Sequence, residues 1–242
     1  MLGSINLIIG NILIKNPLTA FLKKRINYLK YNNLLIKNEN LENYVFGSIL
    51  FKFYEKTEIL FIKKYFKPIT TIDVGSGLGI TSGILNKKYQ KKNFLSILVE
   101  ANKKNLNFSK KLFKLNKINK NTKFLNNVFI GSSKKHFSFN IKSTLNSKIK
   151  LSKKKNSQIK SIKFDQIKKK YEFKYFQIIF DIEGEEFNFN KNFLKKLQYC
   201  TRAIIEVHTK SQKKQNKFIK KLYKYSNLKL KDKKNFVFYF ER

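Results

Sequence analysis

Short continuous runs of apolar residues recur along the chain, separated by longer segments in which apolar residues stand three or four positions apart. The short runs predict buried strands of a parallel sheet, and the longer segments predict amphipathic helices. The predicted strands are 71–74, 94–99, 123–130, 176–180 and 203–207, and the predicted helices of this region are 56–66, 80–88, 102–116, 187–197 and 217–225. This alternation predicts an α/β fold with a doubly wound, mostly parallel, Rossmann-like sheet.

The C-terminal end of the chain departs from this alternation. Residues 228–230 and 235–240 flank the polar turn KDKKN, which predicts an antiparallel hairpin. Together with the five strands above, the hairpin makes a seven-stranded sheet. Residues 131–163 mix short β-like pieces with runs of Lys, Ser and Asn, and they predict a loop or hairpin excursion from the sheet.

The N-terminal part has a different pattern. Residues 17–31 predict a basic amphipathic helix, whereas residues 44–54, which are rich in aromatic and β-branched side chains around Gly47, predict an irregular strand or a hairpin. We therefore divide the chain into a helical or irregular extension, residues 1–54, and a domain that contains the sheet, residues 55–242.

The first 14 residues, MLGSINLIIGNILI, are apolar and uncharged. They lack the positive start and the small-residue cleavage site of a secretory signal, so we expect a helix that docks on the rest of the protein. No stretch approaches the ~20 apolar residues that span a bilayer. The single cysteine, Cys200, fits a reducing compartment, and we expect a cytoplasmic protein. Weak contact of Lys23, Lys24 and Arg25 with an anionic membrane surface is an alternative.

The formal charge of +38 raises the question of nucleic-acid binding. Arginine, which is best suited to contact phosphates and guanine, occurs only at Arg25, Arg202 and Arg242, while lysine is spread over nearly every segment. Lys, Asn, Ile, Phe and Tyr are all abundant, as an AT-rich coding bias would produce. We therefore interpret most of the charge as a solvated surface and keep a nucleic-acid partner as an alternative.

A cluster of glycines follows the first strand of the predicted sheet, in the stretch TTIDVGSGLGITSGIL. Gly75, Gly77 and Gly79 allow the backbone to turn sharply and to approach a ligand closely, and Asp73 stands just before them. We call residues 75–79 the glycine loop. A plain strand-to-helix connection is the alternative, but the strand, the glycines and the helix favour a nucleotide-type cofactor.

Glu100 stands at the tip of the next predicted strand, 21 residues after Gly79. Dinucleotide-type folds place an acidic residue there, and it accepts hydrogen bonds from the ribose hydroxyls of the cofactor. A solvated glutamate at a strand end is the alternative. Position 80 is Ile80, so the glycines form G-x-G-x-G rather than the G-x-G-x-x-G of nicotinamide-binding proteins.

Acidic residues are scarce in this chain, yet four of the 15 lie in the six residues DIEGEE, positions 181–186. The following strand ends in the sequence EVH, which contains Glu206 and His208. Because ligands of open α/β sheets bind beyond the carboxyl ends of the strands, both sequences are expected to line one crevice with the glycine loop. Capping of a helix N-terminus is the alternative for Glu185 and Glu186, and a structural histidine is the alternative for His208.

This crevice suggests roles for its side chains. Asp181 and His208 are candidates for a general base or for a group that orients a hydroxyl, with Glu183 as a third catalytic candidate. Carboxylate oxygens are also ligands for divalent ions, and if a metal binds here, we expect Asp181, Glu183 and Glu206 to hold it.

The motifs together resemble those of FkbM-type methyltransferases, which are class I enzymes that depend on S-adenosylmethionine. The resemblance rests on IDVGSGLG, the strand-end Glu100, FDQI at residues 164–167, IIFDIEGEE and AIIEVH, and it covers about residues 55 to 210. It implies that Asp73, Gly75, Gly77, Gly79 and Glu100 bind the cofactor.

Three positions depart from the pattern of this family. Ser76 and Gly77 stand where an alanine-asparagine pair is common, and Ile179 stands where a lysine usually precedes the D-x-E-G-x-E motif. This motif falls on Asp181, Glu183, Gly184 and Glu186.

The resemblance implies transfer of a methyl group to a hydroxyl of a glycan or of another small hydroxylated metabolite. Two alternatives stay open. One is an RNA methyltransferase, although the N/D-P-P-Y/F motif of base-amine methylation is absent. The other is a relative that binds the cofactor without catalysis.

Overall fold

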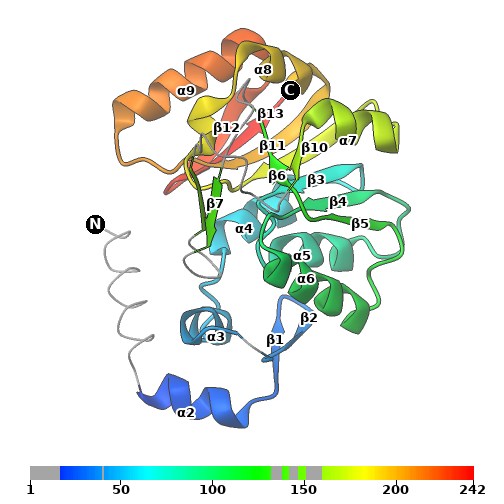
Figure 1. Ribbon diagram of the computed structural model, residues 1–242, viewed down its shortest axis with the longest axis vertical. Coiled ribbons are helices and arrows are strands. Elements are labelled where there is room, and N and C mark those ends of the chain that lie inside the picture. Colours follow the sequence, from blue (N-terminus) through cyan, green and yellow to red (C-terminus); the bar gives the residue numbers. More distant parts are fainter. Residues whose placement is uncertain (1–16, 40, 132–137, 142–146, 151–159) are drawn as a thin grey trace.

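The computed structural model describes residues 17–39, 41–131, 138–141, 147–150 and 160–242 (Figure 1), so the helix expected within residues 1–14 lies outside the described residues. In spatial order, the strands of the central sheet are β12 (Lys229–Lys234), β13 (Val237–Glu241), β11 (Cys200–Glu206), β10 (Phe176–Phe180), β3 (Thr71–Val74), β4 (Ser96–Val99) and β5 (Thr122–Leu125). The five strands from β11 to β5 are parallel, and β13 is antiparallel to both its neighbours. The predicted seven-stranded, mostly parallel sheet with an antiparallel C-terminal hairpin is confirmed. The position predicted for the turn of this hairpin, KDKKN, is wrong, because residues 231–234 belong to β12 and the chain turns at residues 235–236.

Helices cover both faces of this sheet (Figure 1). On one face lie α4 (Lys56–Tyr65), α5 (Ile80–Lys88) and α6 (Lys103–Leu115), and on the other lie α7 (Phe164–Tyr171), α8 (Lys191–Lys196) and α9 (Gln212–Tyr225). None of the helices in the described ranges is long and apolar enough to cross a bilayer.

The strand β3 positions one polar side chain by simple alternation. Ile72 and Val74 join the hydrophobic cluster on the side of α7, α8 and α9. Asp73 points to the opposite face, because successive side chains of a strand alternate, and there it meets Ser82 of α5. The chain runs from β3 outward to β5 and then returns to β10 on the other side of β3. The carboxyl ends of β3 and β10 therefore border the crevice in which open α/β sheets bind ligands.

The helix predicted over residues 17–31 is wrong in its second half. The helix α2 spans Pro17–Arg25, and β1 (Tyr28–Tyr31) then pairs antiparallel with β2 (Leu34–Lys37). Between the strands, Asn32 and Asn33 have φ angles of 47° and 67°. Asparagine tolerates this left-handed conformation, which a two-residue hairpin turn requires at both positions. Burial alternates along β1, as expected for a strand.

The irregular strand or hairpin predicted over residues 44–54 is also wrong, because α3 (Asn43–Leu50) is a helix. Its residues Val45, Phe46 and Ile49 follow helical spacing and are buried. A Cβ atom on Gly47 would lie 3.3 Å from the side chain of Thr19 in α2. The glycine therefore allows two helices to pack closely, and it does not interrupt a strand.

Other predictions need correction in their boundaries. The strand predicted over residues 123–130 forms two strands, β5 and β6 (Val128–Phe129), since Asn126 between them donates from its side chain to the main-chain oxygens of Glu100 and Ala101. The helix predicted over residues 187–197 is divided into the 3₁₀ turn η1 (Glu185–Asn188), α8 and a second 3₁₀ turn, η2 (Leu197–Tyr199).

In the described part of residues 131–163, the predicted excursion contains a hairpin and one short strand. The hairpin consists of β7 (Ser138–Ile141) and β8 (Ser147–Lys150), which are antiparallel, and β9 (Ser161–Ile162) pairs with β6. The residues that connect these three strands lie outside the described part of the chain.

The N-terminal hairpin and α3 share a hydrophobic cluster with α5 and α6. A Cβ atom on Gly83 of α5 would lie 2.9 Å from Leu34, so β2 rests directly on that helix. The side chain of Asn116 accepts from the main-chain nitrogen of Leu35 and donates to its oxygen, both at 2.8 Å. The division at residue 54 stays a prediction, but residues on its two sides are packed in one core.

We expect Leu34→Ala to lower the free energy of unfolding by about 2–5 kcal/mol, because it leaves a cavity between β2 and α5. The unfolding transition should stay single, since the hairpin and the sheet share a core. Leu35→Ala is the matched control: Leu35 is 41% exposed, whereas Leu34 is fully buried. Urea unfolding followed by circular dichroism and by tyrosine fluorescence measures both. Equal stabilities of the two variants would contradict the shared core.

Candidate functional site

The glycine loop joins β3 to α5, and its glycines have positive φ angles of 80° at Gly75, 52° at Gly77 and 70° at Gly79. A Cβ atom on Gly75 would lie 1.7 Å from the main-chain oxygen of Asp181, so no larger residue fits there. A Cβ atom on Gly79 would lie 2.7 Å from the hydroxyl of Ser109. At Gly77, by contrast, it would meet nothing within 4 Å. The middle of the loop therefore borders open space that a ligand can fill.

Asp73 lies beneath this loop and is 3% exposed. The hydroxyl of Ser82 donates to its Oδ2 at 2.6 Å. Burial raises the pKa of Asp73 to about 7, against the effect of this hydrogen bond, and the negative charge of Asp181 adds to the rise. A buried carboxylate without a cationic partner would be stabilised by a positively charged ligand.

Glu100 follows β4 and holds the glycine loop from the other side. Its Oε2 accepts from the main-chain nitrogen of Gly77 at 2.8 Å, and its Oε1 accepts from that of Asn102 at 2.6 Å. Burial raises the pKa of Glu100 to about 7, although these two hydrogen bonds lower it. Glu100 thus fixes the position of the loop, and binding of a ribose by its remaining lone pairs stays a prediction.

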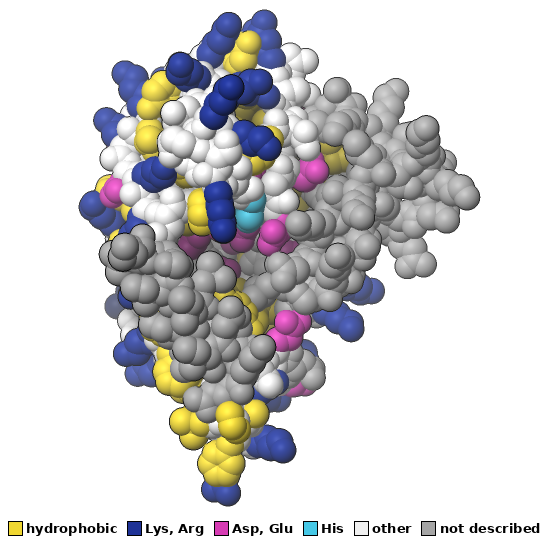
Figure 2. All heavy atoms as spheres, turned by 90° about the vertical axis from the view of Figure 1, so that its left-hand side faces the viewer, with side chains coloured by type: hydrophobic (Ala, Val, Ile, Leu, Met, Phe, Trp, Pro, Cys, Tyr) yellow, Lys and Arg dark blue, Asp and Glu magenta, His cyan; other side chains and the backbone are white. Residues whose placement is uncertain are grey.

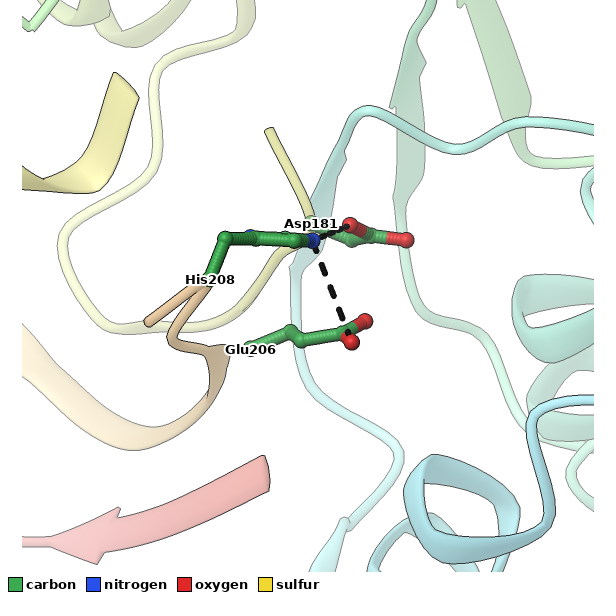
Figure 3. A group of neighbouring side chains, drawn as sticks. All are labelled: Asp181, Glu206 and His208. Atoms are coloured by element: carbon green, nitrogen blue, oxygen red, sulfur yellow. Dashed lines mark ion pairs between the residues drawn. The ribbon is translucent and has the colours of Figure 1, made fainter. Parts of the chain in front are cut away.

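His208 brings the second group of predicted residues together. From its Nε2, the distances are 3.3 Å to Oδ1 of Asp181, 3.8 Å to Oε1 of Glu206 and 3.9 Å to Oε2 of Glu183. Asp181 comes directly after β10, and His208 comes two residues after β11, which is the neighbouring strand. Figure 3 shows the side chains of Asp181, Glu206 and His208 converging from these two strand ends.

Glu186 supports the histidine from its other side. Its side chain is completely buried, and its Oε1 accepts from the main-chain nitrogen of His208 at 2.7 Å and lies 3.6 Å from Nδ1 of the ring. It stands in the first turn of η1, as the capping interpretation expects, but its carboxylate is directed at the histidine. Glu185 instead accepts from the side chain of Asn188.

The carboxylates determine the charge of His208. Burial lowers the pKa of the ring, but the carboxylates of Asp181, Glu186 and Glu206 outweigh burial and raise it to about 11. The pKa of Glu206 is raised to about 8, first by burial and then by the charges of Asp181 and Glu58. At neutral pH His208 is therefore an imidazolium, and it partly compensates the negative charge around it.

Two acidic residues of this site did not emerge from the sequence motifs. Glu55 precedes α4 with a φ angle of 42°, and its carboxylate accepts from the hydroxyl of Thr81 in α5. Glu58 lies in the first turn of α4. Burial raises the pKa of Glu58 to about 7 and that of Glu55 well above its usual range, and the negative charge of Asp181 raises both further. The start of α4 thus adds two carboxylates to this site.

More than half of the 15 acidic residues of the chain meet in this one place. We call this set the acidic cluster; it consists of Glu55, Glu58, Asp73, Glu100, Asp181, Glu183, Glu186 and Glu206. Figure 2 shows acidic side chains and a histidine gathered near the middle of one face, with Lys and Arg around them. Within the described ranges, no Lys or Arg forms an ion pair with the cluster's members Glu55, Glu58, Asp73, Glu100, Asp181 or Glu206.

The fold around this site is that of the Rossmann-like methyltransferases. A solved structure described as a putative S-adenosylmethionine-dependent methyltransferase from Streptococcus mutans is similar over 89% of this chain and 55% of its own, with a TM-score of 0.53 and 10% sequence identity. A methyltransferase FkbM from Methylobacillus flagellatus is similar over 95% of this chain and 60% of its own, with a TM-score of 0.48 and 11% identity. The chain spans less than two thirds of the length of either structure.

No protein-family model matches the sequence, and no curated protein matches it significantly. At 10% identity, the likeness to the Streptococcus mutans structure shows the fold. Membership of the FkbM family and the roles of the individual site residues stay predictions.

We expect Asp73→Asn to stabilise the ligand-free protein at alkaline pH. The pKa of Asp73 is about 7 in the folded protein and lies above its value in the unfolded chain. The free energy of unfolding of the wild type therefore increases as the pH falls from 7 to 4, and above pH 7 the buried charge destabilises the fold to its full extent. The amide keeps the Ser82 hydrogen bond without the charge. At pH 8 the variant should be more stable by up to about 4 kcal/mol, and the difference should vanish near pH 4. Urea unfolding from pH 4 to 8 measures this, and a less stable variant at pH 8 would contradict it.

Proposed function

We propose that this protein transfers a methyl group from S-adenosylmethionine to a hydroxyl oxygen of an acceptor. One observation carries the proposal: the glycine loop, which is open at Gly77, lies directly against the acidic segment that holds Asp181. The glycine loop, which would bind a nucleotide-type cofactor, thus lies at the same edge of the sheet as carboxylates that can accept a proton.

The residues around the loop fit S-adenosylmethionine. The first turn of α5 presents main-chain N–H groups that can hold the carboxylate of its methionine part. Asp73, which is buried, and Glu55, which is half-buried, have no described Lys or Arg partner and suit its ammonium and sulfonium charges. The hydroxyl of Ser76, which is 6% exposed, makes no hydrogen bond to any described residue and is left for the ligand.

When bound, the cofactor supplies an activated methyl group whose bond to sulfur breaks as the bond to the acceptor oxygen forms. A hydroxyl attacks poorly unless its proton is removed, so the protein contributes alignment and a base. We assign the base to Asp181, which stands beside the loop. His208, whose pKa is raised to about 11, cannot accept this proton at neutral pH and instead donates from Nε2 to orient the acceptor. Asp181 and Glu186 favour the charged form of the ring, and Glu186 holds the residue in place by accepting from the main-chain nitrogen of His208.

The acceptor in this proposal is a glycan or another hydroxylated metabolite. A second candidate, a hydroxyl carried by RNA, is favoured by the distribution of charge. The acidic cluster contains eight of the 15 acidic residues, so the rest of the chain has seven against 53 Lys and Arg. Affinity for RNA should then fall steeply with salt, with a slope that reports the number of phosphates contacted. Affinity independent of salt would exclude this candidate.

Gly77→Arg should abolish binding of S-adenosylmethionine, because the new side chain fills the open space at the loop. Gly77→Asn is the matched control: asparagine tolerates the left-handed conformation at this position, and it is common there in FkbM-type enzymes. Calorimetry with S-adenosylmethionine and with S-adenosylhomocysteine measures both. The cofactor assignment fails if the wild type binds neither compound, or if Gly77→Arg binds as well as Gly77→Asn.

Asp181→Asn should lower kcat by about 10²–10⁴-fold, the usual contribution of a general base, while the affinity for S-adenosylmethionine is largely kept. Formation of S-adenosylhomocysteine over a panel of glycans, sugars and phenolic or polyketide hydroxyls is the measurement. Glu185→Gln, which removes the same charge from the same segment, should leave kcat unchanged. Full activity of Asp181→Asn would remove Asp181 from the role of base.

A further inference from the structure

We propose that Asp181, Glu206 and His208 bind a divalent first-row metal ion such as Mn²⁺ or Zn²⁺. One ligand atom from each, an oxygen or a ring nitrogen, can be chosen so that all lie within 4.8 Å of one another. The three side chains converge from the ends of the adjacent strands β10 and β11 (Figure 3). This inference concerns the same crevice as the proposed function, but metal binding itself does not depend on that function.

The distances suit a common ion. Two ligand atoms that are each about 2.1 Å from a metal stand roughly 3.0 to 4.2 Å apart, depending on the angle between them. Nε2 of His208 lies 3.3 Å from Oδ1 of Asp181 and 3.8 Å from Oε1 of Glu206. All three ligand atoms lie within 4.8 Å of one another, so side-chain rotations that bring the longest of these distances to about 4.2 Å or less would place the atoms around one centre.

The second observation is Glu186, behind the histidine. Its side chain is completely buried, and its Oε1 lies 3.6 Å from Nδ1 of His208, on the side away from Asp181 and Glu206. Histidines that bind metals usually direct their other ring N–H at a carboxylate, which fixes the tautomer and frees the opposite nitrogen for the ion. Glu186 stands where that carboxylate is needed.

Unsatisfied polar atoms mark the same centre. Oδ1 of Asp181, Oε2 of Glu186 and Nδ1 of His208 are buried, and none of them makes a hydrogen bond to a described residue. Buried polar atoms are normally paired by a hydrogen bond. Among the described residues, Oδ1 of Asp181 has instead the 3.3 Å ion pair with Nε2 of His208, which lacks hydrogen-bond geometry. Binding of a divalent ion at Nε2 would displace the proton that this nitrogen carries in the metal-free protein. The ion would then compensate Asp181 and Glu206 in place of the imidazolium charge, and the remaining ring proton on Nδ1 would face Glu186.

The donor set selects the kind of ion. Ca²⁺ and Mg²⁺ prefer ligand sets made only of oxygen, whereas a ring nitrogen with two carboxylates suits Mn²⁺ or Zn²⁺. His208 thus takes the place of Glu183 in the set predicted from the sequence, which was Asp181, Glu183 and Glu206. Glu183, whose Oε2 lies 3.9 Å from Nε2, is not among the three residues whose ligand atoms all lie within 4.8 Å of one another.

The role of the ion rests on the proposed function. Asp181 is held against Gly75 of the glycine loop, so an ion on Asp181 lies on the acceptor side of the cofactor seat. A hydroxyl bound to a divalent ion loses its proton more readily and is held in one orientation. The metal site would therefore select acceptors that present an oxygen. Because the ion would lower the pKa of the bound hydroxyl, a weaker base than a free carboxylate would be enough to remove its proton.

The test uses the full-length protein, stripped of metal with a chelator and titrated with MnCl₂ in the absence of cofactor. The electron paramagnetic resonance signal of free Mn²⁺ gives affinity and stoichiometry. We expect one site per chain, at least tenfold weaker binding in Glu206→Gln and in Asp181→Asn, and binding about 10–100-fold weaker in Glu186→Gln. Glu185→Gln is the matched control and should bind Mn²⁺ as the wild type does. Broadening of the His208 ring resonances by Mn²⁺ should confirm the histidine ligand.

Zn²⁺ binding is measured in a parallel calorimetric titration. The proposal is overturned if neither Mn²⁺ nor Zn²⁺ binds at one site per chain. It is also overturned if Glu206→Gln and Glu185→Gln bind Mn²⁺ equally. Thermal unfolding of each variant verifies that the fold is intact. If a ligand variant fails to fold, Glu186→Gln gives a second readout, because its amide can still accept from the main-chain nitrogen of His208. A protein that binds Mn²⁺ but not S-adenosylmethionine would refute the proposed function and leave the metal site standing.

Discussion

The concentration of carboxylates at the carboxyl ends of the strands is the physical constraint on which the rest of this structure depends. Burial in a medium of low polarity disfavours each charge, and the charges repel one another, which is why Asp73, Glu58 and Glu100 all have a pKa of about 7. The chain has 53 Lys and Arg, yet in the described ranges only His208 offers a cation to the centre of the cluster. Stability alone would not select such an arrangement. A ligand that carries positive charge would lower the free energy of this arrangement, as the proposed binding of S-adenosylmethionine or of a metal ion requires.

The scaffold holds these charges in place from several sides. The sheet contributes Asp73, Asp181 and Glu206 from three neighbouring strands, and α4 adds Glu55 and Glu58 from above the glycine loop. Glu100 ties the loop to the end of β4 through two main-chain N–H groups. The N-terminal hairpin and α3 pack behind α5 and α6, so they support the helix that begins at the glycine loop.

The sheet and the two main parts of the site could be predicted because their signals are local. Apolar runs bounded by glycines or acidic residues give the strands, and IDVGSGLG and DIEGEE mark strand ends. Signals that depend on tertiary contact were missed. The pair Asn32–Asn33 is a turn signal, but the lysines and apolar residues before it also fit a helix. Gly47 suggests an irregular strand until Thr19 is known to pack on it. Glu55 and Glu58 lack a motif, and only the scarcity of acidic residues in this chain could have drawn attention to them.

The contact between Gly75 and Asp181 has a mechanical consequence. The main-chain oxygen of Asp181 occupies the place that a side chain would take at position 75, so the two loops are in contact along their backbones. They cannot shift independently over any appreciable distance. Main-chain packing thus fixes the distance between the glycine loop, which would bind the methyl donor, and Asp181, which would act on the methyl acceptor. A change in the backbone of either segment during evolution would require a compensating change in the other.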